Sequence, residues 1–232
     1  MKQLHLLSGG AAKGLVTALG ERFAAQSGCD IQGTFGAVGM MKDALLSGEP
    51  CDVLILTQAL VAQLTDSGDL VRGSARPLGV VKTGVAVKDG EPVPAVDSAD
   101  ALKAVLLGAK GIYFPDPVKA TAGIHFMKVL RSLGIESQLS ERLRPFPNGA
   151  TAMREMAQCD EAGLVGCTQV TEILYTPGVT LAGHLPKEFE LATVYTAAVC
   201  SKAKQPALAA ELISLMAGPE AAALRRSGGF ES

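Results

Sequence analysis

"LLSGGAAKGLVTAL", residues 6–19, joins an apolar run to a helix-forming segment through Ser8, Gly9 and Gly10. The composition predicts a strand that passes into a helix through a glycine turn. A helix N-terminus carries unpaired N–H groups and a partial positive charge, so such a turn can bind an anion. An ordinary helix cap with a tight turn would have the same sequence. The stretch matches neither GxGxxG nor GxxxxGK, and it therefore does not indicate a nucleotide site of those kinds.

Strand and helix patterns alternate along the first third of the chain. Strands are predicted at residues 2–8, 30–36 and 51–57, and helices at 11–26, 38–47 and 58–67. This βαβαβα order predicts a parallel sheet covered by helices, with right-handed crossovers. A long strand-like segment at 77–90 and a proline-rich loop at 91–99 follow, and together they are a candidate hinge.

A second series of the same kind occupies the rest of the chain. Its predicted helices are 98–107, 121–133 and 149–158, its strands 110–116, 142–146 and 162–167, and it ends with a strand-like run at 184–200 and a helix at 204–226. Two such series joined by two long strands predict two lobes with a ligand cleft between them. We expect one lobe to hold residues 1–88 plus 194–232 and the other residues 89–193.

The amino-acid composition disfavours several classes of function. Of the 232 residues 48% are hydrophobic and 19% charged, with a formal net charge of -2, which disfavours disorder and nucleic-acid binding. The absence of Trp and the 4% aromatic content disfavour stacking on sugars. No apolar stretch reaches the length of a membrane span. The N-terminus shows no secretory signal, so we expect a cytoplasmic protein as the chain is given, or a periplasmic one if a leader was removed.

Cysteine and histidine spacing predicts neither a disulfide framework nor a metal site. The five cysteines form no CxxC and are odd in number, so we expect buried free thiols. His5, His125 and His184 lack metal-ligand spacing, and no cofactor is predicted.

Four stretches in order carry a resemblance to a known family. They are "FGAVGMMKDALLSGEPCDVLILTQ" (35–58), "DPVKATAGIHFMKVLRSLGI" (116–135), "GLVGCTQVTEIL" (163–174) and "GPEAAALRRSGGF" (218–230). Together the chain resembles the solute-binding proteins of molybdate-type ABC transporters, which have the type II periplasmic-binding fold. The resemblance implies a two-lobed α/β protein, each lobe a mixed, mostly parallel sheet flanked by helices. It further implies a monomer that closes on a small anion and delivers it to an ABC permease.

The resemblance also implies a set of ligand residues. They are Ser8, Gly9, Gly10, Ala11, Ala37, Val38, Gly39, Thr121, Ala122, Gly123, Asn148, Gly149, Ala150, Gly166, Cys167, Thr168 and Gln169. From their chemistry we add Thr57 as a hydrogen-bond donor and Lys82 and Lys119 as cations. Molybdate binders usually have serines where this chain has 37–39, and often a tyrosine where it has 166–169. An organic carboxylate is therefore the favoured anion over molybdate.

An alternative function arises within the same family. One variant branch resembles aconitate isomerase, an enzyme that shifts a double bond in a tricarboxylate. A 1,3-proton shift needs a base and donors that stabilise the developing charge. His125, Lys119 and Glu172 are the titratable candidates, with His125 as the base, although a lone His is more often structural. A cytosolic ligand sensor without a transporter partner is a third possibility.

Overall fold

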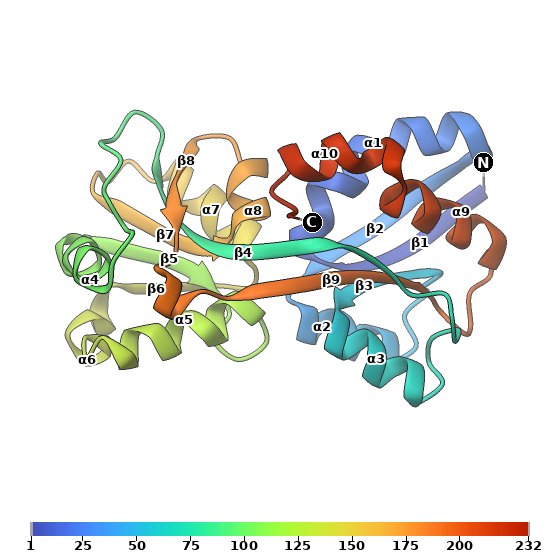
Figure 1. The fold of residues 1–232 in the computed structure, drawn as a ribbon, viewed down its shortest axis with the longest axis horizontal. Coiled ribbons are helices and arrows are strands. Elements are labelled where there is room, and N and C mark those ends of the chain that lie inside the picture. The colour runs from blue at the N-terminus through green and yellow to red at the C-terminus, as the bar shows by residue number, and fades with distance from the viewer. Residues whose placement is uncertain (1, 232) are drawn as a thin grey trace. The chain divides into compact units, whose positions relative to one another are not determined.

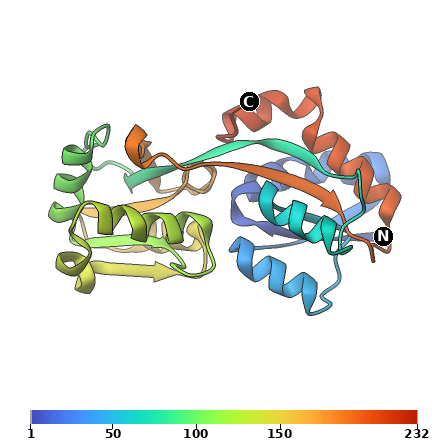
Figure 2. The ribbon, with the colours of Figure 1, turned by 60° about the horizontal axis from the view of Figure 1, so that its bottom comes forward.

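The computed structural model describes residues 2–231, and it divides into two compact units by its internal contacts. Unit 1 is Met1–Val81 together with Thr193–Ser232, and unit 2 is Lys82–Ala192. The chain passes from unit 1 to unit 2 within strand β4 (Arg76–Lys88) and returns at the start of β9 (Ala192–Val199). Each unit is an α/β sheet covered by helices (Figures 1 and 2).

Unit 1 has a mixed sheet in the strand order β2-β1-β3-β9. Its strands are β1 (Lys2–Gly9), β2 (Cys29–Gly36), β3 (Val53–Thr57) and β9, and its helices are α1 (Lys13–Ser27), α2 (Val38–Leu46), α3 (Gln58–Asp66), α9 (Pro206–Ala217) and α10 (Ala222–Ser227). Strand β1 is parallel to β2 and β3, whereas β9 is antiparallel to β3. Helices α1 and α9 cover one face, and α2 and α3 cover the other (Figure 1).

The chain order explains this division of the helices. From β1 the chain moves to one side through α1 to reach β2, and it then crosses back over β1 through α2 to reach β3. Right-handed crossovers in opposite directions place their helices on opposite faces. Because Ser8 pairs with Phe35 in β2 and with Ile55 in β3, the carboxyl ends of all three strands lie at one edge.

Unit 2 repeats this plan in the strand order β4-β7-β5-β6, with β8 on β4. Its further strands are β5 (Gly111–Pro115), β6 (Leu143–Phe146), β7 (Leu164–Gln169) and β8 (Val179–His184), and its helices are α4 (Ala99–Gly108), α5 (Thr121–Ser132), α6 (Glu136–Leu139), α7 (Gly149–Gln158) and α8 (Val170–Tyr175). Strand β5 is parallel to β6 and β7, whereas β4 is antiparallel to β7 and β8. The mixed, mostly parallel α/β class predicted from the sequence is confirmed.

Unit 2 has two hydrophobic cores, one for each face of its sheet. One contains Phe114 and Phe126, whose ring centroids lie 5.3 Å apart, together with apolar residues of α4 and α5. The other contains Met153 and Met156 of α7 and Ile173 of α8. Unit 1 has one large core, to which β1, β3, α1 and α9 all contribute. Each sheet is therefore held by buried apolar contacts on both faces.

Two predicted elements take a different form in the structure, and other elements were not predicted. The strand expected at 184–200 is confined to β9, because Pro186 precedes the 3-10 turn Lys187–Phe189. The helix expected at 204–226 is interrupted at Gly218 and Pro219, where the two parts meet at 51°. Helix α8 and strand β8 were not predicted.

Membrane-spanning potential is confined to that bent helical pair. Within residues 2–231 no single helix has the length and apolarity needed to cross a bilayer, and only Pro206–Ala217 with Pro219–Ser227 meets the criterion jointly.

Candidate functional site

In unit 1 the first ligand loop predicted from the sequence lies at the carboxyl edge of the sheet. Ser8 is fully buried, and its hydroxyl donates to the carbonyl oxygen of Gly9 at 2.8 Å. A Cβ at Gly9 would lie 2.9 Å from Val38 Cγ1 and 3.1 Å from Tyr195 Cε1. Glycine is required here because the turn packs closely against the start of α2 and against β9.

Two helices of unit 1 begin at this edge with no side-chain cap among the described residues. A 3-10 turn at Gly10–Ala12 leads into α1, and α2 begins after Ala37; neither start receives a side-chain hydrogen bond. Helix α3 differs, because the Thr57 hydroxyl accepts from the N–H of Leu60 at 3.4 Å. The first turns of α1 and α2 can therefore donate to an anion.

In unit 2, helix α5 also begins without a side-chain cap. Thr121 is its first residue, and Ala120 precedes it without a side-chain cap. A Cβ at Gly123 would lie 2.2 Å from the carbonyl oxygen of Pro115 and 2.3 Å from that of Asp116. Gly123 is thus what lets this helix begin directly on the end of β5.

The start of α7 is already occupied by a carboxylate of the protein. Glu172 is 6% exposed, and its side chain accepts from the backbone N–H groups of Gly149, Ala150 and Gln169. The Thr168 hydroxyl donates to Glu172 Oε2 at 2.6 Å.

Close contacts around Gly149 leave no room for a further side-chain atom beside Thr168 and Glu172. A Cβ at Gly149 would lie 1.9 Å from Thr168 Oγ1 and 2.0 Å from Glu172 Oε2. Asn148 caps the same helix by accepting from the N–H of Thr151 at 2.8 Å. The structure therefore brings Asn148, Gly149, Thr168 and Gln169 together, as four of the predicted ligand residues, around a buried glutamate.

Burial shifts the pKa of this glutamate. Desolvation raises the pKa of Glu172, although the hydrogen bonds from Thr168 and the backbone act in the opposite direction. Burial likewise raises the pKa of the adjacent Cys167 thiol, which holds it in the protonated form. The raised pKa favours the protonated form of Glu172 relative to an ordinary carboxyl group.

The charged and titratable candidates lie elsewhere in unit 2. Lys82 Nζ lies 3.2 Å from Glu190 Oε2, so a carboxylate already offsets its charge. Lys119 is exposed, and its backbone N–H donates to Asp116 at 2.8 Å. His125 Nε2 donates to the carbonyl oxygen of Phe189 at 2.8 Å. This bond fixes the orientation of the His125 imidazole within unit 2.

Sequence reasoning missed three buried hydroxyl groups, that of Thr196 in unit 1 and two in unit 2. The hydroxyls of Thr83 and Thr171 are buried and have no hydrogen-bond partner among the described residues. Thr83 in β4 pairs with Gln169 in β7, and Thr171 lies in the first turn of α8. An unpartnered buried hydroxyl is costly, so both are candidates for a polar contact with a ligand. An isolated threonine in a strand or helix carries no sequence signal of this kind.

Metal chemistry has no support in the part of the chain that the structure describes. Within residues 2–231 no three His, Cys, Asp or Glu side chains are grouped so that they could hold a metal ion.

The chain is similar in sequence to a protein family and to a characterised enzyme. The family model "Bacterial extracellular solute-binding protein" matches residues 4–231. An aconitate isomerase from Pseudomonas sp is 28% identical over 189 residues, which cover 79% of this chain and 69% of that protein.

Two solved structures have the same fold. The periplasmic molybdate-binding protein of Azotobacter vinelandii superimposes with a TM-score of 0.81 at 21% identity, covering 99% of both chains. The sulfate-binding protein of Mycobacterium tuberculosis superimposes with a TM-score of 0.77 at 16% identity, covering 99% of this chain and 86% of that one.

Proposed function

Because the chain belongs to the family of bacterial extracellular solute-binding proteins, we propose that it binds a small multivalent anion, and we take the starts of α1 and α2 in unit 1 and the start of α5 in unit 2, each by itself, as candidate sources of donors. One observation carries the proposal: these helices begin at the carboxyl edges of their sheets without a side-chain cap. Their N–H groups supply donors that are already oriented, and the helix dipoles favour negative charge. Solved proteins of this fold that bind molybdate and sulfate support the class of ligand.

The energetics require more than helix dipoles. Micromolar affinity needs about 8 kcal/mol, whereas each helix end contributes roughly 0.3–1 kcal/mol. Hydrogen bonds to a charged ligand contribute about 1.5–3 kcal/mol each, so three or four of them supply the remainder. In unit 2, Thr121 at the start of α5 and the unpartnered Thr83 and Thr171 are the side-chain donors proposed for this role.

An organic carboxylate is the proposed ligand class. Ala37, Val38 and Gly39 offer no hydroxyl to a tetrahedral oxyanion. The aconitate isomerase relative acts on a tricarboxylate, which is consistent with such a ligand. We further propose that the protein works outside the cytoplasm as a monomer and passes its ligand to an ABC permease.

A thermal-shift panel tests the function directly. The panel contains molybdate, tungstate, sulfate, phosphate, citrate, and cis- and trans-aconitate. A ligand at one hundred times its Kd stabilises the folded state by about 2.7 kcal/mol, which raises Tm by roughly 5–10 °C in a protein of this size. No shift with any member would refute the proposal.

Two pairs of variants test the helix starts. Thr121→Asp places a carboxylate at the first residue of α5, and Met40→Glu places one in the first turn of α2, where Met40 is 38% exposed. Each should weaken anion binding at least tenfold while leaving the fold intact, because an acidic residue suits a helix N-terminus. The matched controls Thr121→Asn and Met40→Gln carry no charge and should bind within about threefold of the wild type. Equal loss in both members of a pair would contradict an electrostatic role.

An isomerase of the aconitate type is the second candidate, and Glu172 favours it. Desolvation raises the pKa of the buried carboxyl group even though its hydrogen bonds act to lower it, and a carboxyl group with a raised pKa suits proton exchange. The base predicted from the sequence is His125, whose Nε2 donates to the carbonyl oxygen of Phe189. Interconversion of cis- and trans-aconitate is followed by absorbance. Activity that survives His125→Ala and is lost in Glu172→Gln would support this function, and no activity in the wild type would exclude it.

A further inference from the structure

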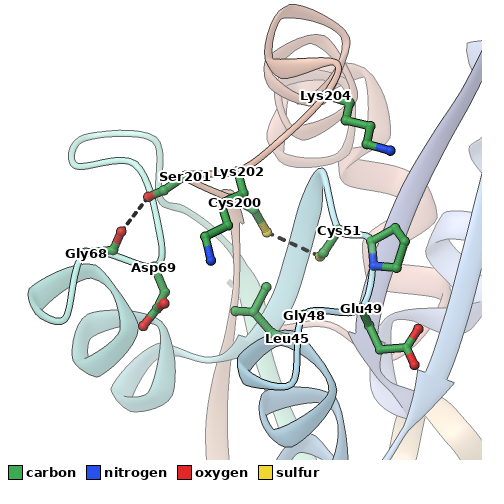
Figure 3. A pocket seen from close by; sticks show the side chains of 11 residues that line it. Leu45, Gly48, Glu49, Cys51, Gly68, Asp69, Cys200, Ser201, Lys202 and Lys204 are labelled. Carbon is green, nitrogen blue, oxygen red and sulfur yellow. Dashed lines mark hydrogen bonds between the residues drawn. The ribbon is translucent and has the colours of Figure 1, made fainter.

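Two cysteines of unit 1 lie side by side although 149 positions separate them in sequence. Cys51 precedes β3 and Cys200 follows β9, and their Sγ atoms lie 3.2 Å apart (Figure 3). A disulfide requires an S–S separation of about 2.05 Å, so a movement of roughly 1 Å would suffice to close the bond. The other cysteines, Cys29, Cys159 and Cys167, show no such pairing within the described residues.

The surrounding backbone fixes this approach. Val53 pairs with Val199 in the antiparallel β3–β9 ladder, and the N–H of Cys200 donates to the carbonyl oxygen of Asp52 at 3.0 Å. Both carboxylate oxygens of Asp52 are also used, one by the N–H of His5 at 2.8 Å and the other by that of Gln205 at 2.9 Å. The two cysteines are therefore held together by the sheet itself rather than by flexible loops.

The pair is also reachable from solvent. A pocket on unit 1 is lined by both cysteines together with Glu49, Asp69, Ser201, Lys202 and Lys204 (Figure 3). Cys51 is 9% exposed and Cys200 is 2% exposed, so Cys51 is the more accessible thiol.

From this geometry we propose that Cys51 and Cys200 form a disulfide when the protein meets an oxidising disulfide compound. The Cys51 thiolate attacks the external disulfide, forming a mixed disulfide and releasing one thiol. Cys200 then attacks the Cys51 sulfur and releases the second thiol. Each cysteine loses one proton, one S–S bond forms within the chain, and the external compound accepts two electrons as it becomes two thiols. The inference is independent of the proposed ligand.

Two further observations agree with this modification. The family is extracellular, and disulfides persist in oxidising compartments. The link would close a loop of 149 residues that contains the whole of unit 2, so the stabilisation expected from restricting the unfolded chain is large. The contact with Cys51 and burial both raise the pKa of the Cys200 thiol, which agrees with Cys51 as the thiol that attacks first.

Thiol counting by mass spectrometry tests the proposal. The folded, reduced protein is incubated with glutathione disulfide at pH 8, then unfolded and labelled with a maleimide. The five cysteines of the wild type should fall to three labelled thiols, and proteolysis should yield a linked peptide containing Cys51 and Cys200. Wild-type Tm should rise by several degrees on oxidation and return on reduction.

Three serine variants complete the experiment. Cys51→Ser and Cys200→Ser should each prevent the linked peptide and the Tm rise, and either variant suffices if the other fails to fold. The control Cys167→Ser removes a buried thiol without a cysteine partner, and its four thiols should fall to two. Five labelled thiols in the oxidised wild type, a lasting glutathione adduct on Cys51 without closure, or thiol loss that persists in Cys200→Ser would each overturn the proposal.

Discussion

Removal of the buried carboxylate in unit 2 should destabilise the protein far more than removal of an exposed one. Glu172→Ala leaves four donors without their acceptor: the Thr168 hydroxyl and the N–H groups of Gly149, Ala150 and Gln169. Each unsatisfied buried donor costs about 1–3 kcal/mol, and removal of a desolvated carboxyl group offsets part of the sum over four donors. We therefore expect the free energy of unfolding to fall by about 3–5 kcal/mol.

The assay is guanidinium unfolding followed by far-UV circular dichroism. Glu211→Ala is the matched control, because Glu211 lies exposed on α9, and it should change stability by no more than about 0.5 kcal/mol. Glu172→Gln keeps one acceptor oxygen and should lie between the two. A loss below about 1 kcal/mol in Glu172→Ala would refute the reasoning, because the four donors would then have found other partners at little cost.

Two further predictions concern pH and backbone packing. Folding raises the pKa of Glu172 above its ordinary value of 4.5. The contribution of Glu172 to the free energy of unfolding should therefore be complete below pH 4.5 and should be lost as pH rises through the folded-state pKa. The slope should reach at most about 1.4 kcal/mol per pH unit in urea titrations and should be absent in Glu172→Gln; equal slopes would contradict the raised pKa. Gly123→Ala should lose about 1–3 kcal/mol by denaturant unfolding, because its Cβ would meet the carbonyl oxygens of Pro115 and Asp116. Gly20→Ala, with nothing within 4 Å in α1, should instead gain roughly 0.5–1 kcal/mol, and the same sign for both variants would be inconsistent with this packing.

The regular part of the fold could be predicted from sequence because local pattern and tertiary contacts agree there. The apolar run before Ser8 and the Ser8-Gly9-Gly10 turn predict the β1–α1 transition, which the structure confirms. The segment 170–184 could not be predicted, because a six-residue helix and a six-residue strand are too short to show a period. Gly218 and Pro219 are residues typical of a helix end. The apolar residues on both sides of them nevertheless led to the prediction of one continuous helix over 204–226.

The site was less predictable because its contacts are long-range. Residues 148–149 and 168–169 come together around Glu172, yet nothing in their order indicates that a glutamate of the next helix would take the α7 donors. The approach of Cys51 to Cys200 depends in the same way on the β3–β9 pairing. These residues come together only because particular strands pair in the sheet. The local sequence does not specify which strands pair.

If uncapped helix starts bind the anion, the backbone amides of their first turns will report the binding through their chemical shifts. In a ¹⁵N–¹H titration with trans-aconitate, and in a second one with molybdate, at least one anion should shift the amides of Gly10, Gly39 and Ala122 saturably. The amide of Gly149 should stay unchanged, because the Glu172 carboxylate already holds it. Shifts confined to Gly149 and its neighbours, or no shift at any helix start with either anion, would contradict the account.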